Sequence, residues 1–233
     1  MTWIKICGTT NLEDALMCAE AGADALGFVF AESPRQVSTD QVAQIIAKLP
    51  AALEKVGVFV LPATTDPSFV SRLEQTFEEL ERITAEAGLT ALQLYGAGYN
   101  HDWQSRIAKQ GLKIIRVFSI NQQPEGTLIA FGDKENLFAV VWDSGTKAQP
   151  GGTGVVWDWE SWPENSGWRP PARFSRMIVA GGLSPQNVGK AIRILHPWGV
   201  DVVSGVERAP GKKDPAKVKA FIRAVREADA TKQ

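Results

Sequence analysis

Short runs of apolar residues alternate with longer amphipathic stretches along the whole chain. The apolar runs have the length of buried strands, and the amphipathic stretches repeat their apolar residues at helical spacing. Strands are predicted at 3–7, 25–30, 55–61, 89–94, 113–118, 137–142, 177–180 and 200–203. Helices are predicted at 11–21, 39–49, 66–87, 101–110, 185–195 and 215–229, with a short one within 121–135.

This alternation predicts parallel strands that are joined by crossover helices. The runs at 25–30 and 140–142 are apolar throughout, which is typical of strands covered on both faces. An open, doubly wound sheet is the alternative, but eight units within 233 residues favour a closed (β/α)8 barrel, the TIM barrel. No linker separates the units, so we expect residues 1–233 to form a single catalytic domain. The Trp- and Pro-rich stretch at 157–171 lies between two units of the same series, so it is not expected to separate domains.

Composition and charge are those of an ordinary globular protein, with 44% hydrophobic and 22% charged residues. The 25 basic and 26 acidic residues nearly balance, which argues against a nucleic-acid partner. No apolar run approaches the roughly 20 residues that cross a bilayer, so no membrane association is expected. The chain begins directly with a strand and has only two cysteines, with no disulfide expected, which favours a reducing cytoplasm. Protein partners are not predicted.

The first predicted strand carries the first candidate catalytic residues, because active residues of such barrels lie where strands end. Alternation places Trp3, Lys5 and Cys7 on one face, inside the barrel, with Cys7 at the catalytic mouth. Cys7 can act as a base if its pKa is lowered, whereas most buried thiols are only small apolar side chains. Lys5, one layer deeper, is expected to pair with a carboxylate; a Schiff-base amine is the sharper alternative. Cys18 is expected to pack within its helix.

Two charged residues follow other predicted strands. Asp143 comes directly after an apolar strand, and apolar surroundings raise the pKa of a carboxyl, which suits a general acid. A turn or capping role is the alternative for Asp143. Arg35 follows the second strand and could hold a substrate carboxylate by a bidentate pair, although a solvated loop arginine is commoner.

Glycine-rich segments follow strands late in the chain, at 151–154, 180–183 and 204–207. Glycines expose backbone N–H groups to an anion, and in barrels the loops after the seventh and eighth strands commonly bind phosphate. A single such segment indicates only a turn. Together they predict a phosphorylated small-molecule substrate, held by Gly154, Gly181, Gly182, Ser204 and Gly205.

Other local patterns add little chemistry. Gly22-Ala23-Asp24 and Gly199-Val200-Asp201 resemble each other, and recurring helix-to-strand turns explain this better than duplication of a half-barrel. The two histidines are predicted in or near helices, and no metal-ligand spacing or G-x-G-x-x-G segment after a strand occurs. Neither a metal nor a cofactor is therefore expected.

Taken together, the segments resemble the phosphoribosylanthranilate isomerase family of tryptophan biosynthesis. The opening Lys5-Ile6-Cys7-Gly8 and the closing segment from Ser204 to Asp214 are together highly specific. Further matches run nearly end to end, at 33–35, 57–59, 92–94, 143–144, 151–154, 157–159, 180–188 and 199–201.

The resemblance implies an Amadori rearrangement of phosphoribosylanthranilate to a 1-deoxyribulose phosphate ketone, without a cofactor. It implies that Asp143 is the general acid, which protonates the furanose ring oxygen, and that Cys7 is the general base, which removes the C2′ proton. It also implies that Arg35 holds the anthranilate carboxylate and that the glycine-rich strand ends bind the phosphate.

The chain departs from the family pattern at a few positions. Tyr95 stands where the family usually has His, Val203 precedes Ser204 where a second serine is common, and Val155 and Val156 follow the glycine-rich loop. We expect none of these to touch the proposed acid or base, and Tyr95 to affect only the pocket wall.

Three other functions remain as alternatives. One is a phosphosugar enzyme in which Lys5 forms a Schiff base. Another is the related aminoaldose isomerase of histidine biosynthesis, but that family uses carboxylates at strands 1 and 5, where this chain has Cys7 and Phe118-Ser119. The last is a non-catalytic phosphate-binding barrel, which the presence of both Cys7 and Asp143 disfavours.

Overall fold

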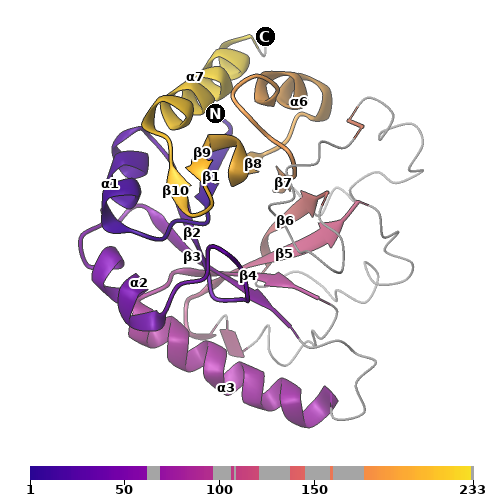
Figure 1. The fold of residues 1–233 in the computed structure, drawn as a ribbon. Helices are drawn as coiled ribbons and strands as arrows, with labels where there is room; N and C mark the ends of the chain where they lie inside the picture. The colour runs from indigo at the N-terminus through magenta and orange to yellow at the C-terminus, as the bar shows by residue number, and fades with distance from the viewer. Residues whose placement is uncertain are drawn as a thin grey trace.

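The computed structural model of the chain is a closed barrel of parallel strands with helices packed around it (Figure 1). It describes residues 1–61, 69–96, 106–107, 109–120, 137–144, 158–159 and 176–231. The barrel strands are β1 (Trp3–Cys7), β2 (Ala25–Val29), β3 (Glu54–Val60), β4 (Ala91–Tyr95), β5 (Lys113–Ser119), β6 (Leu137–Asp143), β7 (Met177–Val179) and β8 (Gly199–Val202). β1 pairs in parallel with both β2 and β8, which closes the barrel. The predicted (β/α)8 barrel is confirmed.

The helices surround the strands, and most follow the prediction closely. They are α1 (Leu12–Glu20), α2 (Thr39–Ile46), α3 (Phe69–Ala87), α6 (Val188–Leu195) and α7 (Pro215–Ala230). The structure adds a 3-10 turn, η1 (Ser204–Val206), and a small hairpin, β9 (Glu207–Ala209) with β10 (Lys212–Lys213), which were not predicted. Most of the helix predicted at 101–110, the short helix within 121–135 and nearly all of the Trp- and Pro-rich stretch lie outside the described residues.

The helix ends follow from local capping chemistry. The side chain of Asn11 accepts a hydrogen bond from the Asp14 N–H at 2.9 Å, which makes Asn11 the N-cap of α1. Asp214 caps α7 in the same way, with Pro215 in the first helical turn. Gly22 follows α1 with φ of 101°, a conformation that other residues rarely adopt, so the chain can turn there into β2.

Alternation along the strands separates two apolar cores. Ile4 and Ile6 belong to the core between strands and helices, as predicted. The core inside the barrel consists of Ala25, Val56, Ala91, Ile115, Val117, Ala139, Val141, Ile178 and Ala180. Trp3 stacks on Trp198 with ring centroids 5.1 Å apart and meets Phe138 edge-on. These aromatic rings fill the end of the barrel where the strands begin, and so leave the opposite end for the site.

None of the helices in the described part of the chain is long and apolar enough to cross a membrane.

Candidate active site

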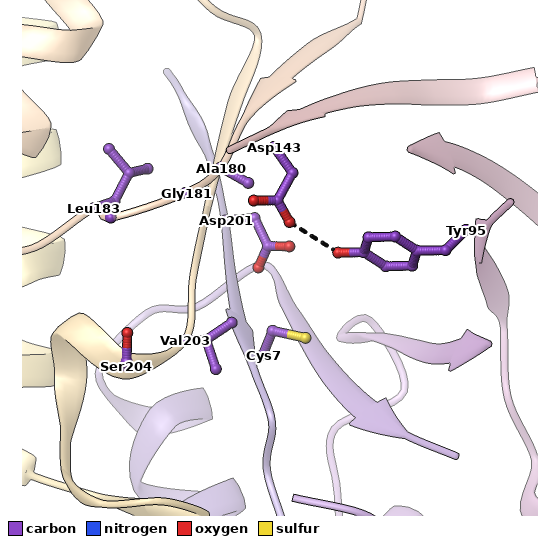
Figure 2. A pocket seen from close by; sticks show the side chains of 10 residues that line it. Cys7, Tyr95, Asp143, Ala180, Gly181, Leu183, Asp201, Val203 and Ser204 are labelled. Carbon is purple, nitrogen blue, oxygen red and sulfur yellow. Dashed lines mark hydrogen bonds between the residues drawn. The ribbon is translucent and has the colours of Figure 1, made fainter. Parts of the chain in front are cut away.

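A pocket lies at the end of the barrel where the strands finish. It is lined by Cys7, Tyr95, Asp143, Ala180, Gly181, Gly182, Leu183, Asp201, Val203 and Ser204. Figure 2 shows the side chains of Cys7, Tyr95, Asp143 and Asp201 directed toward one space from four different strands. Strands that are distant in sequence thus bring ionisable groups together, as expected for the carboxyl end of a parallel barrel.

The structure gathers most of the predicted site residues around this pocket. Cys7, Asp143, Gly181, Gly182 and Ser204 all line it. Two predicted residues, Gly205 and Arg35, do not line it, and Gly154 lies outside the described residues.

Cys7 is the last residue of β1 and is only 4% exposed. Burial raises the pKa of the Cys7 thiol, while the ammonium of Lys5 opposes that rise. The sequence-based condition for a thiolate base, a lowered pKa, is therefore not met, because desolvation outweighs the nearby positive charge. Cys18 is buried in α1 as predicted, and neither cysteine forms a disulfide.

Lys5 forms a buried ion pair directly below the pocket. Its Nζ lies 2.7 Å from Asp201 Oδ2, and β1 and β8 place the two residues side by side. The predicted pairing of Lys5 with a carboxylate is confirmed. Burial alone would lower the pKa of Lys5, but Asp201 and Cys7 outweigh it and the pKa is raised. Lys5 therefore stays protonated, which disfavours the Schiff-base alternative because that chemistry needs a neutral amine.

The turn interpretation of Gly199-Val200-Asp201 is wrong. Gly199 starts β8 and Asp201 lies inside the strand, whereas Asp24 precedes β2 and accepts a hydrogen bond from the Ile4 N–H at 2.8 Å. The two segments look alike in sequence but are placed differently relative to their strands. Sequence reasoning consequently missed Asp201, which was interpreted as turn chemistry although it lines the pocket.

Asp143 is the last residue of β6, is 4% exposed and forms a hydrogen bond with Tyr95. The Tyr95 hydroxyl donates to Asp143 Oδ2 at 3.0 Å, as the dashed line in Figure 2 marks. The expectation that no family departure would touch the proposed acid is therefore wrong. A tyrosine reaches farther than a histidine from the same position at the end of β4, and its hydroxyl arrives at the carboxyl across the pocket.

Close packing of the strand-7 and strand-8 loops explains several glycines. A Cβ on Gly205 would lie 1.9 Å from the Leu183 carbonyl oxygen, and one on Gly181, whose φ is 88°, would lie 2.1 Å from Ser144 Oγ. Asn187 shapes the first of these loops by accepting from the Ser184 N–H and donating to the Gly182 carbonyl. Glycine at Gly181 and Gly205 is thus required by the fold itself, and phosphate binding at these loops stays a prediction.

Arg35 lies beside the first strand and is held by an internal carboxylate. Its Nη2 and Nε lie 2.7 and 2.9 Å from the two carboxylate oxygens of Glu207 on β9. A Cβ on Gly8 would be 2.6 Å from Arg35 Cδ, so the arginine crosses the chain directly after Cys7. Arg35 forms a bidentate pair in the structure with Glu207, and its pairing with a substrate carboxylate stays a prediction.

Lys213 links this ion pair to Cys7. Its buried Nζ lies 3.0 Å from Glu207 Oε1 and donates to the Cys7 carbonyl at 2.5 Å. Burial would raise the pKa of Glu207, but Arg35 and Lys213 together lower it, so the carboxylate stays ionised. The unpredicted hairpin β9–β10 therefore anchors both the backbone of Cys7 and the guanidinium of Arg35.

Gly27 leaves room for the Cys7 thiol, and Gly27→Ala should displace it. A Cβ at Gly27 would lie 2.4 Å from Cys7 Sγ and 3.0 Å from Lys5 Cε. We expect kcat to fall by about 10²-fold, because a displacement near 1 Å can cost that much. Steady-state kinetics of folded Gly27→Ala, beside Gly57→Ala, which crowds Leu89 and Phe59 instead, measure the effect. An unchanged kcat for Gly27→Ala would show that turnover does not depend on the position of the Cys7 thiol.

Arg35→Ala should act on substrate binding rather than on the chemical step. The expected bidentate pair between Arg35 and the substrate carboxylate is charge-assisted, so its loss should raise KM by about 10- to 100-fold. Arg35→Lys keeps the charge but not the planar fork, so it should recover only part of the affinity. Kinetics beside a thermal melt test this. A normal KM in Arg35→Ala with a lowered melting temperature would show that Arg35 stabilises the fold through Glu207 and does not bind the substrate.

Comparisons with known proteins agree on one family. The model of the family described as N-(5'-phosphoribosyl)anthranilate (PRA) isomerase matches residues 4–224. An N-(5'-phosphoribosyl)anthranilate isomerase of Chlorobaculum tepidum is 40% identical over 231 residues, covering 98% of this chain and 97% of that protein.

Solved structures lead to the same family. The phosphoribosyl anthranilate isomerase of Thermotoga maritima is similar with a TM-score of 0.76 and 33% identity, covering 97% of this chain and all of that one (100%). A second such structure is a complex with reduced 1-(o-carboxyphenylamino)-1-deoxyribulose 5-phosphate, with a TM-score of 0.73, 32% identity and the same coverage of 97% and 100%.

Proposed function

Because this chain belongs to the phosphoribosylanthranilate isomerase family and is an isomerase of tryptophan biosynthesis, we propose that Cys7 and Asp143 are the base and acid of its reaction. The substrate is N-(5-phosphoribosyl)anthranilate, and the product is 1-(2-carboxyphenylamino)-1-deoxyribulose 5-phosphate. The observation that carries this proposal is the placement of both side chains on one pocket, beside the glycine-rich ends of β7 and β8. General acid–base chemistry needs two such groups within reach of one substrate.

Asp143 starts the reaction as the general acid. Its carboxyl O–H gives its proton to the furanose ring oxygen, and the C1′–O bond breaks with its electron pair moving to that oxygen. The lone pair of the anthranilate nitrogen forms the C1′=N bond of an open-chain iminium. The position of Asp143 supports this role, because its carboxyl lines the same pocket as the Cys7 thiol.

Cys7 completes the rearrangement as the general base. Its thiolate takes the C2′ proton, the C–H electron pair forms the C1′=C2′ bond, and the C1′=N pair returns to nitrogen. The enolamine then takes a proton at C1′ and becomes the ketone. The positive charge of Lys5 opposes the effect of burial on Cys7, so it favours the thiolate at the moment it is needed.

Binding is proposed to use groups around this pair. Backbone N–H groups of Gly154, Gly181, Gly182, Ser204 and Gly205 hold the phosphate of the small-molecule substrate, and Arg35 holds the anthranilate carboxylate. Residues 1–233 act as one catalytic domain in the cytoplasm.

The test is a direct assay on the purified chain. Fresh N-(5-phosphoribosyl)anthranilate is mixed with the protein, and the decay of its anthranilate-type fluorescence is followed. Fast decay that yields the ketose phosphate supports the proposal. A folded protein that leaves the substrate unchanged would contradict it and would direct the search to related aminoaldose phosphates.

A further inference from the structure

Tyr95 occupies the pocket beside the proposed acid, in a position where the family usually has histidine. We propose that Tyr95 is a positioning residue for Asp143: its hydroxyl orients the carboxyl and stabilises the carboxylate that forms once the proton has been given to the ring oxygen. This inference rests on the acid role proposed for Asp143.

The contact bridges two strands that do not pair with each other. Tyr95 ends β4 and Asp143 ends β6, with β5 between them in the barrel. The Tyr95 hydroxyl lies 3.0 Å from Asp143 Oδ2, within the usual range of an O–H···O bond. The hydroxyl therefore fixes one carboxyl oxygen across the mouth of the barrel (Figure 2), and with it the orientation of the carboxyl in the pocket.

A second, longer contact reaches the same hydroxyl. Gln93, two residues earlier on the same face of β4 and 1% exposed, places its Nε2 3.5 Å from the Tyr95 hydroxyl. An amide nitrogen only donates, so this longer contact is compatible with a hydroxyl that directs its own hydrogen to Asp143.

The surrounding charges keep Tyr95 a donor. Burial raises the pKa of Tyr95 well above its ordinary value, and the negative charges of Asp143, Asp201 and Cys7 raise it further. Lys5, the cation beside Cys7, is paired with Asp201. Within the described part of the chain, Asp143, Asp201 and Cys7 are the ionisable groups that act on the hydroxyl, so Tyr95 remains neutral while Asp143 and Cys7 exchange protons with the substrate.

This arrangement favours the transition state over the bound substrate. Before the step, Asp143 is a neutral acid and the bond from Tyr95 is an ordinary one. As the proton leaves for the ring oxygen, negative charge develops on the carboxyl and the same bond becomes charge-assisted. A donor that is already aimed at developing charge accelerates a step because its interaction is stronger in the transition state.

The experiment compares the wild type with Tyr95→Phe and Tyr95→His. Phenylalanine keeps the ring in the pocket but removes the hydroxyl, so kcat should fall by about 10- to 100-fold with KM nearly unchanged. Without the donor, the carboxyl of Asp143 keeps its proton to higher pH. The alkaline limb of the kcat–pH profile, which the acid Asp143 sets, should therefore move to higher pH, while the acid limb, which the base Cys7 sets, should stay in place. Tyr95→His has an N–H donor and should recover part of kcat.

Asp143→Asn and the double variant separate this inference from the proposed function. In an Asp143→Asn background, Tyr95→Phe should cost little more, because the two residues act as one unit. A wild type without isomerase activity, or an Asp143→Asn variant with normal activity, would contradict the acid role proposed for Asp143. If Asp143→Asn is inactive but Tyr95→Phe has normal kcat and unshifted limbs, the acid role stands and the inference about Tyr95 is overturned. A merely structural role would lower the melting temperature without moving a pH limb.

Discussion

Cys7→Ser is expected to lower kcat by about 10²- to 10⁴-fold, the usual contribution of a general base. Serine is close in size, so the pocket and the binding of substrate should survive. A hydroxyl, however, cannot supply an anion near neutral pH, and the positive charge of Lys5 next to Cys7 favours a thiolate far more than an alkoxide. Steady-state kinetics with the fluorescence assay give kcat and KM for both proteins.

Cys18→Ser is the matched control for this prediction. Cys18 is equally buried but lies in α1, and burial raises its pKa to about 12. We expect Cys18→Ser to keep normal kcat, with an effect on stability alone. In the wild type, kcat should rise with pH on the acid side, because the thiolate fraction grows about tenfold per pH unit below the pKa. Cys7→Ser with near-normal turnover would take Cys7 out of the mechanism.

The barrel was predictable from sequence because its signal is local and repeated. Strand boundaries agree within two residues, since runs such as that of β2 are apolar on both faces and their ends are marked by turn residues. The inward direction of Lys5 and Cys7 followed from the two-residue period of a strand. The identity of the carboxylate that pairs with Lys5, Asp201 on the adjacent strand β8, needed the structure.

The contacts between distant residues were not predictable in the same way. Tyr95 and Asp143 are separated by 48 residues, and nothing in the local pattern of either indicates that they meet. Glu207 lies 172 residues from Arg35, so its carboxylate could not be identified as the partner. The hairpin that carries Glu207 has strands of only three and two residues, too short for a periodic signal.

The electrostatic state of Cys7 also needed the structure. From sequence, Cys7 qualifies as a base only if its pKa is lowered, as happens to thiols near cations. The structure supplies that cation in Lys5, but also Asp201 beside it and a buried environment, and the balance raises the pKa of Cys7. A base of this kind is present as thiolate in only a small fraction of molecules near neutral pH, yet that fraction is intrinsically more reactive toward a proton.

The role of Asp143 can be isolated because asparagine keeps its shape. Asp143→Asn should lower kcat by about 10²- to 10⁴-fold while affinity for the ketose product, measured by titration, stays within a few-fold. The amide oxygen can still accept the hydrogen bond from Tyr95, so the pocket keeps its geometry and only the transferable proton is lost. Asp24→Asn, at the opposite end of the barrel, is the control and should keep normal kcat.

Two comparisons then decide between acid catalysis and simple placement of the substrate. If Asp143 only positions the substrate, Asp143→Asn should raise KM and the product Kd together and leave kcat nearly intact, because the amide retains the shape but not the charge. If Asp143 is the acid, kcat falls alone while KM and the product Kd stay within a few-fold, because only the transferable proton is lost. Turnover within a few-fold of the wild type in Asp143→Asn would require another proton donor for the ring oxygen.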